Sequence, residues 1–173
     1  AANDSSHFDM GALLNNTIVS QRPMNAVTFV DNHDTQPGQG LSSFVAGWFK
    51  PLAYAVILLR RDGLPCVFYG DLFGIPHDNI PAVSGLKEMM EVRAGYAYGE
   101  QCDYFDHQDV VGWSREGDDE HEGSGIAVLI SDGPGGEKTM YAGPKHAGEI
   151  YVDVLKHLPD EIVIGADGNA VFK

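Results

Sequence analysis

Two short, almost wholly apolar runs constrain the fold of this chain more than any other feature of its sequence. Residues 26–30 read AVTFV and residues 64–69 read LPCVFY, and turn-forming residues follow each run. Continuous apolar runs of this length are typical of strands that are buried on both faces, as in a parallel sheet. Residues 42–60 between them are rich in apolar side chains and predict the helical connection that a parallel pair requires.

The first part of the chain therefore predicts alternating helices and strands. Residues 10–19 carry apolar side chains near helical spacing, and residues 83–95 predict a further helix. Pro51 is expected to kink or split the central helix, because it lacks a backbone N–H. Trp48 in that helix and Cys66 in the second run are expected to be buried. Two strands make no stable parallel sheet alone, so the pattern indicates part of a larger α/β structure.

The pattern of residues changes after Tyr98. Short β-branched segments follow, separated by Gly, Pro and Asp, which is typical of antiparallel β structure. Two domains are therefore expected, residues 1–97 and residues 98–173, with Trp113 in the core of the second. The predicted strand segments are residues 109–116, 125–132, 138–144, 149–155 and 161–168.

Charge and hydropathy argue against two classes of partner. The chain has 25 Asp and Glu residues against 11 Lys and Arg, a formal net charge of −14. Such a field repels phosphate backbones and anionic membrane surfaces, so no nucleic-acid partner is expected. No membrane partner is expected either, because no stretch reaches the roughly 18 apolar residues of a spanning helix. The chain has two cysteines. If both are free thiols, they slightly favour the cytoplasm over secretion, but they leave the compartment open.

The most informative polar residues follow the first apolar run. Asp31, Asn32, His33 and Asp34 stand at the carboxyl end of the predicted strand and open a loop rich in Gly and Pro. The carboxyl ends of strands are where (β/α)₈ barrel enzymes hold their catalytic residues. From local composition, His33 and Asp34 suit acid–base work, metal ligation or sugar recognition, and a hydrogen-bonded turn explains them equally well.

Two motifs resemble those of the α-amylase family. Residues 29–34, FVDNHD, resemble the motif at the end of the seventh barrel strand, and residues 63–70, GLPCVFYG, resemble the eighth-strand motif G-x-P-x-x-F-Y-G. Residues 48–55 and 104–113 resemble liquefying bacterial α-amylases and their intracellular fungal relatives. The resemblance implies an α/β plus all-β fold: the last two β/α units of a (β/α)₈ TIM barrel, then an antiparallel β-sandwich C-terminal domain.

The resemblance also implies a function. An α-amylase cleaves α-1,4-glucosidic bonds inside starch, glycogen or maltooligosaccharides, with retention at the anomeric carbon. Asp34 matches the family's third catalytic carboxylate, which stabilises the transition state, and His33 matches the neighbouring sugar-binding histidine. Gln36 is a further candidate for sugar binding. Asp31 and Asn32 are interpreted as residues that hold the loop.

Other interpretations stay open because no segment resembles the motifs of the family's nucleophilic Asp or acid/base Glu. The alternative is a non-catalytic fragment, or a starch-binding or structural module. Unpaired strand edges on a partial barrel would then favour self-association. A third interpretation is a related specificity, such as a maltooligosaccharide-forming or branching enzyme.

A calcium ion is a further implication of the resemblance. Asp109 and Asp132 fall on positions that match carboxylate ligands in the family, with backbone carbonyls near Ser6 and Phe8 as their partners. Calcium takes about 6–8 oxygen ligands, so carbonyls and water would have to complete the shell. Two acids in β turns explain the same residues equally well.

Overall fold

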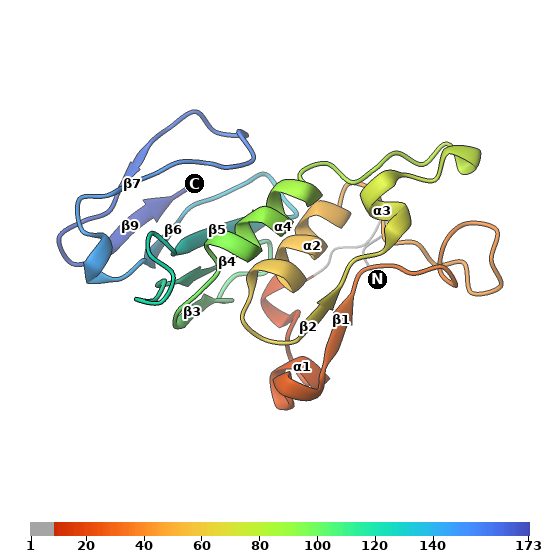
Figure 1. Ribbon diagram of the computed structural model, residues 1–173, viewed down its shortest axis with the longest axis horizontal. Coiled ribbons are helices and arrows are strands. Elements are labelled where there is room, and N and C mark those ends of the chain that lie inside the picture. The colour runs from red at the N-terminus through yellow and green to blue at the C-terminus, as the bar shows by residue number, and fades with distance from the viewer. Residues whose placement is uncertain (1–8) are drawn as a thin grey trace. The chain divides into compact units, whose positions relative to one another are not determined.

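The computed structural model describes residues 9–173, which form two compact units (Figure 1). The described part of the first unit is Leu14–Met90, and the second unit combines Asp9–Leu13 with Glu91–Lys173. None of the helices in these residues is long and apolar enough to cross a membrane.

The first unit is built on a parallel pair of strands. Val27 pairs with Leu64 and Phe29 with Cys66, and α2 packs against both strands, as predicted for a parallel connection. Figure 1 shows α3 directly after the second strand. The elements are α1 (Ile18–Gln21), η2 (Pro23–Asn25), β1 (Val27–Phe29), α2 (Lys50–Leu59), β2 (Leu64–Cys66), α3 (Tyr69–Phe73), η3 (Pro76–Asp78) and the start of α4 (Leu86–Gly95).

Two of the predicted helices are shorter than the sequence pattern suggested. Helix α2 begins at Lys50, so Pro51 lies in its first turn, where the missing N–H leaves no helical bond unmade. The predicted kink is therefore wrong. The helix expected over residues 10–19 is wrong as well, because Asn16 adopts a φ of 58° between η1 (Met10–Ala12) and α1.

The strands of the first unit leave large apolar side chains exposed. Val27 and Leu64 are 61% and 67% exposed, and Cys66 is exposed too. Burial of Cys66 was predicted wrongly, because none of the described residues covers that part of β2. Trp48 is also exposed, since it lies in a turn before α2 instead of inside a helix.

The second unit confirms the predicted antiparallel β structure. Strand β4 lies between β3 and β5, β6 pairs with β9, and β7 pairs with β8. The sequence pattern did not single out β3 or β9. The bounds are β3 (Gln101–Tyr104), β4 (Val110–Arg115), β5 (Ile126–Ser131), β6 (Lys138–Tyr141), η4 (Pro144–His146), β7 (Ile150–Tyr151), β8 (Ile162–Val163) and β9 (Asn169–Phe172).

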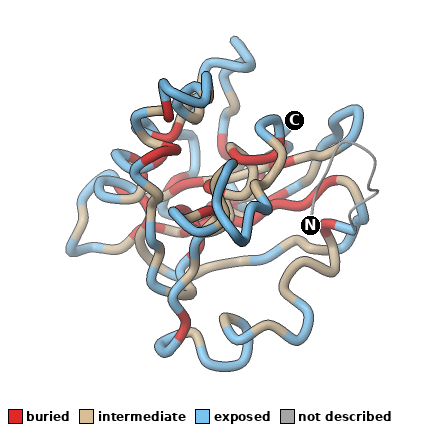
Figure 2. The backbone as a smooth tube through the Cα atoms, turned by 90° about the vertical axis from the view of Figure 1, so that its right-hand side faces the viewer, coloured by how far each residue is buried: buried red, intermediate tan, exposed pale blue. Residues whose placement is uncertain are grey.

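An apolar core holds this second unit together. Strand β4 is buried along its whole length, and Trp113 within it is fully buried, as predicted (buried residues are red in Figure 2). A further cluster forms where β6 and β9 pair. Its members are Met140, Ala142, Ile164, Ala170 and Phe172.

Candidate active site

The candidate active site is the loop that follows β1. The side-chain oxygen of Asn32 accepts hydrogen bonds from the backbone N–H of Asp34 at 2.9 Å and of Thr35 at 3.1 Å. Such a turn is a local preference of Asn, and it supports the interpretation that Asn32 holds the loop. His33 Nε2 lies 3.6 Å from Asp34 Oδ1, and their side chains are 84% and 61% exposed. The two residues predicted to contact sugar therefore stand together on an accessible surface.

Gln36 belongs to the same turn. Its backbone N–H donates to the carbonyl oxygen of Asn32 at 3.2 Å, and the residue is half-buried. The backbone of Gln36 thus continues the structure that presents His33 and Asp34. A contact between the Gln36 side chain and sugar stays a prediction.

Asp31 has the opposite environment from Asp34, although only two residues separate them. Its carboxylate is buried and accepts hydrogen bonds from the Thr35 hydroxyl at 3.1 Å and from the Val45 backbone N–H at 3.3 Å. Asp31 Oδ2 also lies 2.9 Å from the ammonium of Lys50. This one carboxylate therefore ties the beginning and the end of the loop to the start of α2.

The same lysine connects this loop to the end of β2. Lys50 Nζ contacts Asp71 in α3 as well, and the Tyr54 hydroxyl donates to Asp71 Oδ2 at 2.6 Å. The Tyr54 oxygen in turn accepts a hydrogen bond from the Phe68 N–H at 3.4 Å. Asp31, Lys50, Asp71 and Tyr54 are 2%, 3%, 1% and 0% exposed, so the whole network is buried.

Sequence reasoning missed the members of this network other than Asp31. One signal could have pointed to it: Lys50 is a lone charged residue inside the apolar run at residues 48–59. A charge in the middle of such a run is rarely left without a partner once it is buried. The sequence does not say which carboxylates supply that partner, because Asp31 and Asp71 lie in segments far from Lys50 along the chain.

Burial and charge act against each other inside the network. Burial raises the pKa of Asp31 above its ordinary value, although the hydrogen bond and positive charge of Lys50 oppose the rise. Burial also raises the pKa of Tyr54, and the neighbouring Asp71 raises it further, so the phenol keeps its proton. One ammonium therefore faces two carboxylates in a site that excludes water.

The arrangement suits sugar binding better than it suits bond cleavage by these residues alone. An exposed carboxylate and an exposed imidazole can hydrogen-bond neighbouring hydroxyl groups of a sugar. Retaining glycosidases also need a nucleophile and an acid/base about 5 Å apart. Asp31 and Asp71 are buried and engaged by Lys50 and Tyr54, so neither is accessible to a substrate.

The two residues predicted to bind calcium are joined by a backbone hydrogen bond where β4 begins and β5 ends. The Asp132 N–H donates to the Asp109 carbonyl oxygen at 3.2 Å, and Gln108 Nε2 donates to Asp109 Oδ2 at 3.3 Å. Within residues 9–173, no group of three or more His, Cys, Asp or Glu side chains is placed to hold a metal ion. Ser6 and Phe8, which would supply carbonyl ligands, lie outside the described residues. The side chains alone therefore fit only part of a calcium shell.

Comparison with solved structures supports the fold. The chain resembles γ-CGTase from Alkalophilic Bacillus clarkii with a TM-score of 0.55 and 22% identity, over 88% of this chain and 25% of that one. It resembles α-amylase I from Eisenia fetida with a TM-score of 0.54 and 15% identity, over 87% of this chain and 39% of that one. No family model matches the sequence.

Comparison of sequences shows the relationship. The chain is 53% identical to an α-amylase of Geobacillus stearothermophilus over 100% of its own length and 32% of that protein's. It is 52% identical to an α-amylase of Bacillus licheniformis, over 99% of this chain and 34% of that protein. The cytoplasmic α-amylase of Escherichia coli is 39% identical, over 95% of this chain and 35% of that protein. The chain spans about a third of the length of these relatives, and over that third its sequence is similar to those of α-amylases.

Proposed function

We propose that this chain supplies the transition-state-stabilising side of an α-amylase active site. The enzyme would hydrolyse internal α-1,4-glucosidic bonds of starch, glycogen or maltooligosaccharides with retention. The observation that carries the proposal is the placement of His33 and Asp34, which are exposed together at the carboxyl end of β1 in a chain with α-amylase relatives. The parallel pairing of β1 and β2 supports their assignment as the last two strands of a (β/α)₈ barrel.

In this proposal, Asp34 acts by binding and not by attack. Its carboxylate accepts hydrogen bonds from hydroxyl groups of the sugar whose bond is cleaved, and His33 and Gln36 contact the same part of the substrate. Positive charge develops on the sugar ring as the bond breaks, and contacts to the 2-hydroxyl group strengthen at that point. Asn32 fixes the backbone N–H groups of Asp34 and Thr35 in advance, so little reorganisation is needed when the charge appears.

Exchange into a complete enzyme tests this role. We would replace the corresponding third of the Geobacillus stearothermophilus α-amylase with this chain and measure kcat and KM on soluble starch. Asp34→Asn should lower kcat by about 10²-fold or more with a smaller change in KM, because transition-state contacts are lost. Asp119→Asn, in an exposed loop, is the matched control. An Asp34→Asn enzyme with the kcat of the control would refute the proposal.

A second candidate function is a sugar-binding module without hydrolase activity of its own. It is favoured by the burial of Asp31 and Asp71, which leaves Asp34 as the accessible carboxylate at these strand ends. The 173-residue chain and its Asp34→Ala variant would be compared for starch hydrolysis and for maltoheptaose binding. Binding without hydrolysis supports the module. Hydrolysis that disappears in Asp34→Ala means instead that the chain builds a working site.

Calcium binding is proposed for the second unit. Asp109 and Asp132 would supply two carboxylate ligands, and the ion would offset their negative charge and cross-link the strand ends. The proposal rests on their adjacency across the ends of β4 and β5. Calorimetric titration with calcium should release or take up heat, and the ion should raise Tm. Asp109→Asn should abolish both effects, and a wild-type chain without either effect would contradict the site.

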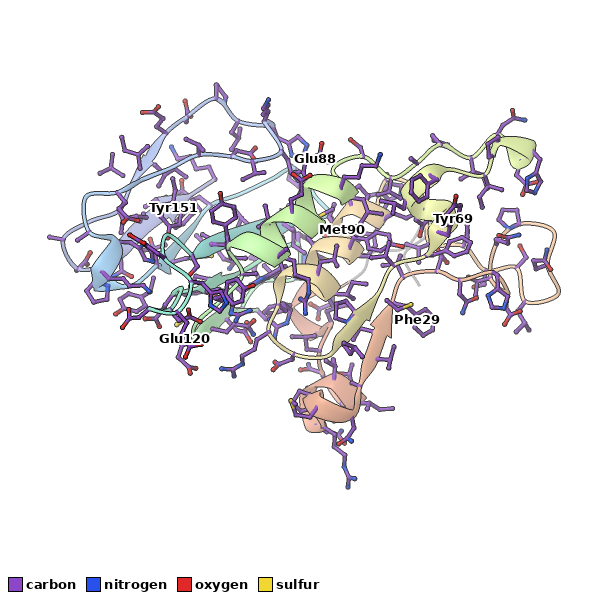
Figure 3. The ribbon with its side chains drawn as sticks, in the orientation of Figure 1. Phe29, Tyr69, Glu88, Met90, Glu120 and Tyr151 are labelled. Atoms are coloured by element: carbon purple, nitrogen blue, oxygen red, sulfur yellow. The ribbon has the colours of Figure 1, made fainter. Side chains whose placement is uncertain are left out.

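Self-association is proposed for the first unit because its strands expose apolar side chains. Figure 3 labels Phe29 on β1 and Tyr69 at the start of α3, which are 51% and 73% exposed. Unpaired strand edges that carry such side chains favour pairing with another chain. Sedimentation velocity over a concentration series should detect a dimer, and Val27→Lys in β1 should weaken it. A monomer at all concentrations would contradict this proposal.

A further inference from the structure

The buried charge of Lys50 is not explained by stability alone. Its ammonium lies between Asp31 and Asp71 and 3.5 Å from the centroid of the Phe44 ring. Removing three charged groups from water is costly, and an apolar cluster of the same volume is often as stable or more stable. A buried charge cluster at two neighbouring strand ends therefore points to a role in fixing one arrangement of the chain.

The arrangement that the cluster fixes is the loop that carries the sugar-contacting pair. Asp31 holds Thr35 near the start of the loop and Val45 at its end. Thr35 is also held by Asn32, whose side chain binds the Asp34 N–H. A displacement of the Asp31 carboxylate would therefore pass directly into the turn that presents His33 and Asp34.

Lys50 Nζ contacts Asp31 Oδ2 at 2.9 Å on one side. Its own position is fixed on the other side by Asp71, and Tyr54 holds the second oxygen of Asp71. The Tyr54 oxygen also accepts a hydrogen bond from the Phe68 N–H, so the series of contacts ends on the backbone that follows β2. The two strand ends are thus joined through a single ammonium group.

We propose that Lys50 is a positioning residue for His33 and Asp34: its charge holds Asp31 in register with Asp71 and so fixes the loop that presents the sugar-contacting pair. Lys50 does not touch the substrate, because it is 3% exposed. The effect on sugar binding rests on the proposed function, whereas the effect on the loop does not.

Amide hydrogen exchange in the 173-residue chain tests the positioning directly. The Val45 N–H donates to Asp31, so its exchange rate reports whether the loop stays closed. Lys50→Met removes the ammonium but keeps an unbranched side chain. We expect Val45 exchange to rise about tenfold or more, while the amides of β4 in the second unit keep their rates. Maltoheptaose affinity should fall about tenfold or more in the same variant.

Tyr54→Phe is the matched control. It removes the hydroxyl group from Asp71 but leaves the contact between Lys50 and Asp31, so Val45 exchange should change less than about threefold. The proposal is overturned if folded Lys50→Met exchanges at Val45 like the wild type. It is also overturned if the loop opens and maltoheptaose affinity does not change, since Lys50 would then serve stability alone.

Two further outcomes stay decisive. If the wild-type chain does not bind maltoheptaose, the proposed function fails for this chain, and Val45 exchange still decides whether Lys50 holds the loop. If Lys50→Met does not fold, Asp31→Asn takes its place, because the amide can still accept from Val45 but is no longer an ion-pair partner. Val45 exchange should then rise about threefold or more, and an unchanged rate would overturn the proposal.

Discussion

The two compact units both bury apolar side chains, but the first also buries an ammonium group between two carboxylates. The second unit is held by apolar packing, with Trp113, Met140 and Ile164 almost fully buried. The first unit buries Lys50 and its carboxylate partners at the ends of β1 and β2, while Phe29, on one of those strands, is 51% exposed. The strand ends of the first unit are fixed by charge, and the candidate active site lies there.

The difference shows where precision is needed. Apolar packing tolerates substitutions that conserve volume, and it places a side chain only as closely as its neighbours can repack. An ion pair with hydrogen bonds on both partners fixes distance and direction together. The residues that are proposed to contact sugar are tied to the second kind of interaction through Asn32, Thr35 and Asp31.

Lys50→Met tests whether charge holds the strand ends of the first unit, and it should have the largest effect on stability. Removal of the ammonium leaves the Asp31 and Asp71 carboxylates buried without it, which should cost about 3–5 kcal/mol of the free energy of unfolding of the first unit. Urea denaturation followed by hydrogen exchange in each unit measures this loss. Lys145→Met, at an exposed position, is the control. A loss below about 1 kcal/mol would mean that charge does not hold these strand ends.

Met140→Ala tests the apolar packing of the second unit and should have the next largest effect on stability. Met140 is fully buried, so the truncation leaves a cavity and should destabilise the second unit by about 2–5 kcal/mol. Phe29→Ala, on the exposed strand of the first unit, is the comparison variant and should cost much less. The same urea experiment measures both. Equal losses would show that the first unit also depends on apolar packing along β1.

The sequence predicted the parts of the fold that depend on local signals. β1, β2 and the antiparallel strands from β4 to β8 follow from apolar runs bounded by turn residues, and the turn at Asn32 follows from the preference of that side chain. Cys66 was predicted wrongly because an apolar run does not reveal whether both faces of its strand are covered. The links from Lys50 to Asp71 and Tyr54 were missed, since they join separate segments and appear only once β1 and β2 lie side by side.

Asp31 in the first unit and Asp153 in the second should change stability with opposite signs as the pH falls. Burial raises the pKa of Asp31 above its ordinary value of 3.8. Burial also acts on Asp153 in the second unit, but hydrogen bonds from the Leu158, Leu155 and His157 N–H groups outweigh it and hold the pKa lower. Ionised Asp31 therefore costs stability, and the cost disappears as the pH falls through its folded pKa towards 3.8. Asp153 stabilises above 3.8, and its contribution is lost as the pH falls through its lowered pKa.

A pH series of two variants measures these signs. The destabilisation caused by Asp31→Asn should grow as the pH falls from neutral to 3.8, because the wild type gains stability over that range. The destabilisation caused by Asp153→Asn should be constant down to 3.8 and shrink below it. If the destabilisation of both variants changed with pH in the same way, burial would not distinguish the two carboxylates.

Asp34→Asn should have the smallest effect on stability and is the sharpest test of the division within the loop. Its side chain is 61% exposed, and the contact that places the residue, from its backbone N–H to Asn32, survives the substitution. The free energy of unfolding should therefore change by less than about 0.5 kcal/mol in urea denaturation. Maltoheptaose affinity should fall at the same time, because the variant loses a charged acceptor for sugar hydroxyl groups.

This last prediction separates the two acids of one turn by what they bind. Asp31 is engaged by the protein and is not accessible to a substrate, whereas the Asp34 carboxylate has His33 as its protein partner at 3.6 Å and is otherwise open to solvent. A loss above about 1 kcal/mol in Asp34→Asn would show that this carboxylate also holds the loop. Charge would then stabilise the whole turn, and exposure would no longer distinguish the residue that is proposed to bind sugar from the residue that is proposed to position it.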